Sequence, residues 1–287
     1  MTFRRVQRRL LQAAAIVIFL VLAGATYQGV ATALERREFP HPGRLVDVGG
    51  HQLHLYCTGE GRPTVVLEAP AAGMSAAWAW IQPQIAATTR VCSYDRAGLG
   101  WSEAGDAPFD PAAVPAQLQA LVERANERGP FVLAGQGLGA ALARLDVERF
   151  GADAVALVAI DPPAAVVNAS QRARTTRLVA FSPWLARTGV LRATKMLSAG
   201  AFGLPDPWDG ALRAFLNRPD HLTRAARELG RWDDTVTLAS AAVLPARLYV
   251  TEVRTGLSDG VDFLSDEREA AAATRAILAA VAVVETR

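Results

Sequence analysis

Hydrophobic and polar positions follow two different patterns along this 287-residue chain. Residues 10–34 form an uncharged, mostly apolar run of 25 residues, and a short stretch containing two prolines and a glycine follows at 39–43. From Arg44 onward, short apolar runs typical of buried strands alternate with segments whose apolar residues recur every three or four positions. This alternation predicts an α/β domain with a mostly parallel sheet and helices on both faces.

The predicted elements can be given by residue range. Helices are expected over 114–128 and 138–150, and another is expected to begin with Ser265 as its N-terminal cap and to end near Ala279. Two strands joined at Gly49-Gly50 are expected within 43–59, another strand is expected at the start of 131–139, and further strands are expected over 64–68, 154–161, 246–252 and 281–286. Helical patterns fill the insertion at 162–245, whose Trp184, Trp208 and Trp232 are expected to pack it onto the core, with contact to a membrane surface or to a partner as the alternative.

A strand turning sharply into a helix is predicted at residues 131–139. Its sequence includes Gly135-Gln136-Gly137-Leu138-Gly139, the layout of a nucleophile elbow, which normally carries a serine at its centre. The two outer glycines permit a tight turn and close backbone approach. Gly137 has no side chain, so the pattern retains the turn without the nucleophile.

Four segments in order resemble the α/β-hydrolase family. They are the hairpin at 43–59, the strand at 64–68, the turn at 94–102, which is similar to the family's D-x-R-G-x-G-x-S, and the elbow. The resemblance implies an α/β-hydrolase-like core made of residues 44–161 and 246–287, with residues 162–245 as its helical cap. It also implies a serine, an acid and a histidine in that chain order for any working member.

The catalytic residues of the family are not all present. Gly137 replaces the serine, and no histidine follows His221, so we expect no catalytic residue and a pseudoenzyme. The oxyanion hole is expected to survive in part, through the backbone N–H groups of Ala71 and Leu138, although Pro70 has no N–H of its own. The other hydroxyl and carboxyl side chains in candidate positions are expected to serve as caps, turns or local hydrogen-bonding groups: Ser75, Ser102, Asp161, Glu252, Asp259 and Asp262.

Composition excludes several functions. The formal net charge is +2, and we find no basic stripe, metal-ligand spacing or phosphate-binding glycine loop, so no nucleic acid, metal or cofactor is expected. Cys57 and Cys92 lie in predicted strands that are neighbours in the family's sheet. They could form one disulfide in an exported domain, but two free thiols are favoured because pairs within a parallel sheet suit the bond poorly.

The N-terminus indicates a membrane anchor. Residues 1–9 form a basic tail with four arginines, residues 10–34 are long enough to cross a bilayer, and residues 35–43 form a linker. The arginines predict a cytoplasmic N-terminus and an extracytoplasmic domain. A signal peptide cleaved near Ala25 is the alternative. Ala25 and Gly29 make a small-residue pair suited to contact with another transmembrane helix.

The C-terminal segment predicts a partner. The strand at 281–286 would lack the helix that family members place after it, so Val283 and Val284 would lie on uncovered sheet. Three functions therefore remain open. We favour a catalytically inactive, membrane-anchored accessory or structural subunit of a membrane protein complex, ahead of a small-ligand receptor using the remnant pocket. An active serine hydrolase of the esterase or lipase type is the third.

Overall fold

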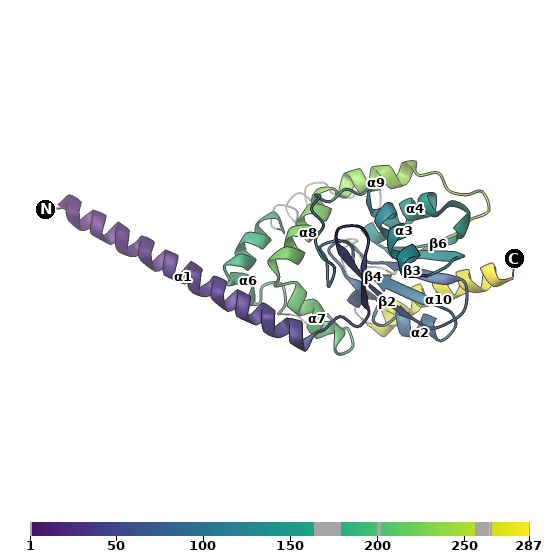
Figure 1. Cartoon of the computed structure of the whole chain (residues 1–287), viewed down its shortest axis with the longest axis horizontal. Coiled ribbons are helices and arrows are strands. Elements are labelled where there is room, and N and C mark those ends of the chain that lie inside the picture. The colour runs from purple at the N-terminus through teal and green to yellow at the C-terminus, as the bar shows by residue number, and fades with distance from the viewer. Residues whose placement is uncertain (1, 164–178, 200–201, 256–263, 265, 287) are drawn as a thin grey trace.

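The computed structural model describes residues 2–163, 179–199, 202–255, 264 and 266–286 (Figure 1). Its centre is a seven-stranded sheet with the strand order β1-β2-β4-β3-β5-β6-β7. The strands are β1 (Arg44–Asp47), β2 (Gln52–Thr58), β3 (Thr64–Glu68), β4 (Val91–Tyr94), β5 (Phe131–Gln136), β6 (Ala154–Ile160) and β7 (Tyr249–Val253). Pairs from β4 through β7 are parallel, whereas β1 with β2 and β2 with β4 are antiparallel.

A disulfide joins Cys57 to Cys92. The two residues are directly opposed in the β2–β4 ladder, with their Cα atoms 4.0 Å apart. The preference for two free thiols was therefore wrong, because the pair lies between antiparallel strands and not within the parallel part of the sheet. Glu127 lies beside the two sulfur atoms, but bonded cysteines offer no thiolate, so this group is not a metal site.

Helices cover both faces of the sheet (Figure 1). On one face, α3 (Val114–Arg124) and α4 (Leu138–Phe150) bury Leu118, Leu121 and Val147 against the strands. On the other, α2 (Gln82–Ala86) and α10 (Glu267–Glu285) bury Ile85 and Ile277. The predicted α/β sheet with helices on both faces is confirmed.

The C-terminal segment is helical, so the predicted edge strand at 281–286 was wrong. α10 begins at the cap Asp266, which accepts hydrogen bonds from the N–H groups of Arg268 and Glu269; Ser265 lies outside the described residues. Its buried positions repeat at helical spacing from Ala270 to Val281 without a glycine or proline to end the helix. Val284 packs against the core and Val283 is half-buried, so the uncovered sheet face that was expected there does not exist.

A single long helix, α1 (Thr2–Glu38), precedes the domain (Figure 1). α1 includes the described part of the predicted tail and residues 35–38 of the predicted linker. The non-helical connection to the domain therefore starts only at Phe39. By length and composition, α1 is long and apolar enough to cross a membrane, with a mean hydropathy of 2.1 in its most apolar window. The described cap consists of the helical residues 179–187 with α6 (Val190–Thr194), α7 (Trp208–Phe215), α8 (Pro219–Gly230) and α9 (Trp232–Ala241).

One face of α1 docks on the cap through small and polar residues. Gly24 lies so close to Thr188 that an added Cβ would be 2.0 Å from its carbonyl oxygen. Gln28 donates to the Asn217 carbonyl over 2.7 Å and accepts from Arg192 over 2.9 Å. Arg192 also forms an ion pair with Glu35. Ala25 and Gly29, by contrast, are exposed, and nothing lies within 4 Å of a Cβ added at Gly29.

Candidate functional site

The elbow has the geometry that its glycines predicted. Gly137 joins β5 to α4 with φ 56° and ψ −124°, and its N–H donates to the Ile160 carbonyl over 2.9 Å. A Cβ at Gly135 would lie 2.2 Å from the Gly139 oxygen, and one at Gly139 would lie 2.3 Å from the Ala69 oxygen. The outer glycines are therefore required by close backbone contact, whereas the central one presents no reactive atom.

Side chains from the cap cover the elbow. Ala71 and Leu138, expected to form the oxyanion remnant, do come together in space, but they are 1% and 0% exposed. They form an apolar cluster with Trp232 of α9, and Leu229 packs against it. Trp232 thus packs against the two residues whose backbone N–H groups were expected to form the oxyanion remnant.

A buried ion cluster lies behind this cover. Arg96 uses all five of its N–H donors: two go to Glu228 of α8 over 2.8 and 3.0 Å, one to Glu68 over 2.5 Å, and two to the carbonyls of Ala69 and Pro70. Glu228 also accepts from the Ala72 N–H over 3.1 Å. The Glu228 carboxylate of the cap thus accepts a hydrogen bond from a backbone N–H group in the loop after β3, next to the expected oxyanion remnant.

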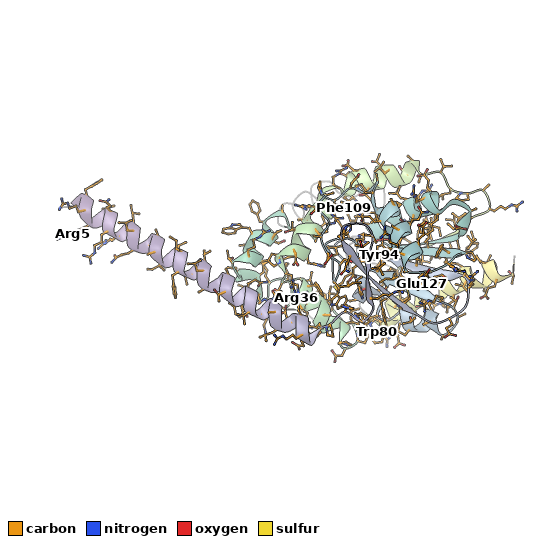
Figure 2. The ribbon with its side chains drawn as sticks, in the orientation of Figure 1. Arg5, Arg36, Trp80, Tyr94, Phe109 and Glu127 are labelled. Carbon is orange, nitrogen blue, oxygen red and sulfur yellow. A yellow bond between two sulfur atoms is a disulfide. The ribbon has the colours of Figure 1, made fainter. Side chains whose placement is uncertain are left out.

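The protonation of this cluster follows from its burial. Burial raises the pKa of the Glu68 carboxyl, and the Arg96 charge opposes that change. Tyr94 donates its hydroxyl to Glu68 at the centre of the domain (Figure 2), and burial raises its pKa well above 10, so it stays neutral. Asp146 of α4 makes no hydrogen bond within the described residues, and burial raises its pKa well above the usual range, with Glu68 adding to the effect. Both effects favour the protonated form of the Asp146 carboxyl.

His221 is the second contact between α8 and the core. It is 1% exposed, and its Nδ1 accepts a hydrogen bond from the Gly100 N–H over 3.1 Å. Burial lowers its pKa to about 4, against smaller opposing effects of Asp220, Asp95 and Glu228. His221 and Glu228 share one face of α8, at positions i and i+7, and both attach the cap to the core.

A serine, a histidine and an aspartate also meet in the core, but not as a catalytic triad. Ser75 Oγ lies 3.5 Å and Asp95 Oδ2 lies 3.0 Å from the same nitrogen, Nδ1 of His54. The other nitrogen, Nε2, accepts from the Gly43 N–H over 3.2 Å. Because both nitrogens are engaged and all three side chains are at least 98% buried, His54 has no free nitrogen to act as a general base toward a substrate.

Comparison with known proteins identifies the family. Residues 65–286 match the model described as "Alpha/beta hydrolase family". This chain belongs to the alpha/beta hydrolase family. The resemblance drawn from the four sequence segments is thereby confirmed.

Solved structures of this family share the fold. An enol-lactonase from Burkholderia xenovorans LB400 superposes with a TM-score of 0.60 at 16% identity, over 83% of this chain and 100% of its own. The Cif epoxide hydrolase from Acinetobacter nosocomialis gives a TM-score of 0.64 at 11% identity, over 87% and 95% of the two chains. An uncharacterised protein of Schizosaccharomyces pombe is 26% identical over 113 residues, which are 39% of this chain and 21% of that protein. These identities establish the fold and not a shared activity.

Ser102 and Asp161, two further residues expected to be caps, turns or local hydrogen-bonding groups, form hydrogen bonds within this alpha/beta hydrolase. Ser102 donates to the Asp95 carbonyl over 2.5 Å and accepts from the His54 N–H over 2.8 Å. Asp161 follows β6 and accepts from the Thr255 N–H over 2.7 Å and from the Thr255 hydroxyl. These bonds join the ends of β6 and β7 across 94 positions of the chain, so Asp161 does not have the local role that was expected. Glu252 is exposed on β7, and Asp259 and Asp262 lie outside the described residues. Asp95, by contrast, is buried. Burial by itself raises the pKa of the Asp95 carboxyl, but His54 and the N–H groups of Ser75 and Trp101 have a larger opposite effect, so the pKa is lowered.

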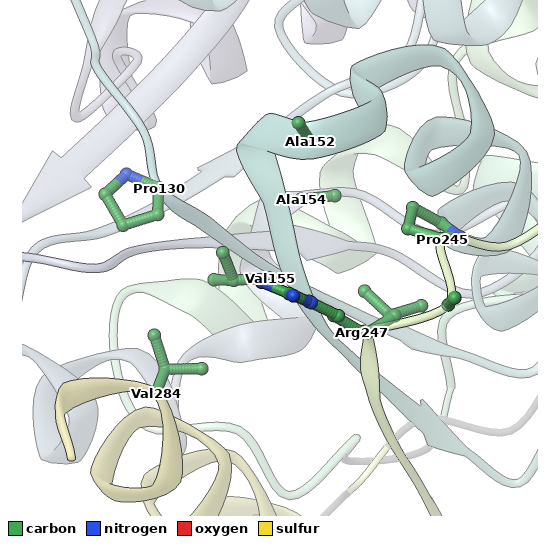
Figure 3. Close-up of a pocket in the computed structure, with 9 residues that line it drawn as sticks. Pro130, Ala152, Ala154, Val155, Pro245, Arg247 and Val284 are labelled. Atoms are coloured by element: carbon green, nitrogen blue, oxygen red, sulfur yellow. The ribbon is translucent and has the colours of Figure 1, made fainter. Parts of the chain in front are cut away.

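A large cavity lies far from the elbow. It has a volume of about 830 Å³ and is lined by Pro130, Ala154, Leu248 and Val284 among others (Figure 3). These residues lie where β5, β6 and β7 begin, whereas Gly137 lies where β5 ends. Among the described residues, the lining offers no serine, cysteine, histidine or carboxylate to this cavity.

Two contacts between the cap and the core near the elbow were not predicted from the sequence. Trp232 was expected to pack the cap on the core, which it does, but its position over Leu138 was not foreseen. The ion cluster was not foreseen either. Its one sequence signal is Glu68, an acidic residue at the end of an otherwise apolar strand.

Proposed function

We propose that this chain is a non-hydrolytic, membrane-anchored member of the alpha/beta hydrolase family that serves as an accessory or structural subunit of a membrane protein complex. The observation that carries the proposal is the elbow, where Gly137 replaces a nucleophile and Trp232 covers Leu138. Enzymes share this fold at 11–16% identity, but chemistry depends on site residues and not on the fold.

Catalysis should be absent from the wild-type protein and should not return in Gly137→Ser. A serine hydroxyl needs an adjacent base, and both nitrogens of His54 and Nδ1 of His221 are already engaged. Fluorophosphonate labelling and p-nitrophenyl acetate hydrolysis should remain at buffer level in both proteins. Gly137→Ala is the matched control for the strain that any side chain meets at φ 56°. A stoichiometric adduct on any serine would contradict the proposal.

The domain is proposed to face away from the cytoplasm on an uncleaved anchor. The four arginines before Leu10 favour a cytoplasmic N-terminus. The Cys57–Cys92 disulfide supports the same sidedness, since such bonds persist in oxidising compartments. Protease added to spheroplasts should digest the domain, and the intact mass should include α1. A mature N-terminus at Thr26 would show cleavage instead, and a protected domain would show the opposite orientation.

The partner is proposed to be another transmembrane helix that packs against Ala25 and Gly29. Gly24 and Gln28 are used by the cap, while Ala25 and Gly29 stay exposed and allow close backbone approach. On native gels of detergent-solubilised membranes, the wild-type protein should run in a larger complex that Gly29→Leu dissolves. Ala23→Leu adds the same bulk on another exposed face and should leave the complex intact. A wild-type protein that runs as a monomer would refute this part of the proposal.

A further inference from the structure

Exposed apolar side chains gather on one part of the cap. Among the described residues outside α1, seven large hydrophobic side chains are exposed, and four of them fall within residues 181–196. These four, which we call the cap tip, are Phe181 at 69%, Trp184 at 63%, Val190 at 40% and Met196 at 64% exposed. The cap tip therefore places two aromatic and two aliphatic side chains in the solvent within 16 residues.

The cap tip lies beside the apolar part of α1. Thr188 and Gly189, between Trp184 and Val190, touch the α1 backbone at Gly24. Gly24 is 14 positions beyond Leu10, or about 21 Å along a helix that rises 1.5 Å per residue. A bilayer hydrocarbon core is about 30 Å thick. An anchor that enters the hydrocarbon at Leu10 thus places Gly24, and the cap tip beside it, about 9 Å inside the far boundary of the hydrocarbon.

Ion pairing holds the cap tip at this depth. Arg192 of α6 pairs with Glu35, which lies 25 positions beyond Leu10 and so about 37 Å along α1, outside the hydrocarbon. Arg192 also donates to Gln28, one turn beyond Gly24. Figure 1 shows α6 alongside the C-terminal half of α1, where Gln28 and Glu35 lie.

The charge of the segment fits a lipid surface. Residues 179–199 contain three basic residues and no acidic residue, and the exposed Arg187 and Lys195 alternate with the apolar side chains. Surface-bound helices combine aromatic and aliphatic residues on one side with lysine and arginine on the other. Tryptophan is enriched at the boundary between hydrocarbon and headgroups.

We propose that the cap tip inserts into the bilayer interface beside α1, with Phe181 and Trp184 among the acyl chains and Arg187 and Lys195 at the phosphates. The proposal rests on the membrane anchoring proposed above. The cap is then attached to the bilayer at two points, by α1 and by its tip. This attachment fixes the orientation of the domain on the membrane.

The test uses the full-length protein in vesicles of phosphatidylethanolamine and phosphatidylglycerol, with and without lipids brominated in the middle of the acyl chain. Brominated chains quench only tryptophans near the hydrocarbon. Trp184 is one of six tryptophans, and α1 contains none. Part of the wild-type emission should be quenched, and Trp184→Phe should lose that part. Trp80→Phe is the matched control, because Trp80 is half-buried beyond the C-terminal end of α1 (Figure 2).

The outcomes separate the cap tip from the anchor. Phe181→Asp should also reduce the quenching, since a carboxylate opposes insertion, while Val243→Asp, at a site that is 75% exposed outside the cap tip, should not. If the protein resists carbonate extraction but its emission is unquenched, the anchor holds and the cap-tip proposal is overturned. If carbonate releases the protein, the anchor itself fails. Quenching that persists in Trp184→Phe would assign the contact to another tryptophan and overturn the proposal as well.

Discussion

Replacing Arg96 by methionine should destabilise the domain by roughly 3–5 kcal/mol, the range expected when one member of a buried ion pair is removed. Arg96 is 2% exposed and satisfies two carboxylates, Glu68 and Glu228, which would both remain buried without it. Because Glu228 belongs to α8, the loss should also loosen the cap. Urea unfolding of the full-length protein in detergent, followed by tryptophan fluorescence, measures the effect.

Two further variants make this result specific. Arg213→Met removes a pair with Asp209 on α7, where the arginine side chain is 34% exposed, and should change stability by less than about 1 kcal/mol. Glu228→Gln in the Arg96→Met background removes one stranded charge, so the double variant should be less destabilised than the sum of the single ones. Additive effects, or a stability equal to that of wild type, would show that the cluster does not hold the cap.

Acidification should destabilise the fold through His221. Its folded-state pKa of about 4 lies below the unfolded value of about 6.5, so the unfolded chain binds the proton first. Stability should therefore fall as the pH drops from 6.5 toward 4, by up to about 3 kcal/mol in total. Above pH 6.5 the histidine should have no effect, because it is neutral in both states.

The pH dependence of stability must be compared between variants, because buried carboxyl groups change the stability with pH in the opposite direction to His221. Burial raises the folded-state pKa of Glu68 and Asp146, so these groups favour the folded state at low pH. His221→Asn keeps an acceptor near the Gly100 N–H, removes the titrating ring, and should flatten the fall in stability between pH 6.5 and 4. His41→Asn changes an exposed ring and is the control. An equal fall in both variants would show that His221 does not titrate in this range.

Local patterns predicted much of the core. Buried strands such as β5 are short and mostly apolar, and the glycine spacing around Gly137 indicated a tight turn because backbone atoms must approach closely there. The uncharged run at 10–34 predicted an apolar helix from residue type alone. The same reasoning failed at 281–286. There, the valine and alanine residues fitted the pattern of a strand locally. The segment is helical because it continues α10, whose buried residues repeat at helical spacing from Ala270 to Val281 and which ends at Glu285.

The sequence by itself therefore determined the α/β sheet, the family, the apolar N-terminal helix and the lack of a side chain at the elbow. Each depends on residue types within a short window. Tertiary structure alone decided that Cys57 opposes Cys92, that Trp232 covers Leu138 and that Arg96 joins Glu68 to Glu228. Arg96 and Glu228 are 132 positions apart in the chain. Contacts over such separations arise from the packing of the cap on the sheet, which no local pattern of hydrophobic and polar residues contains.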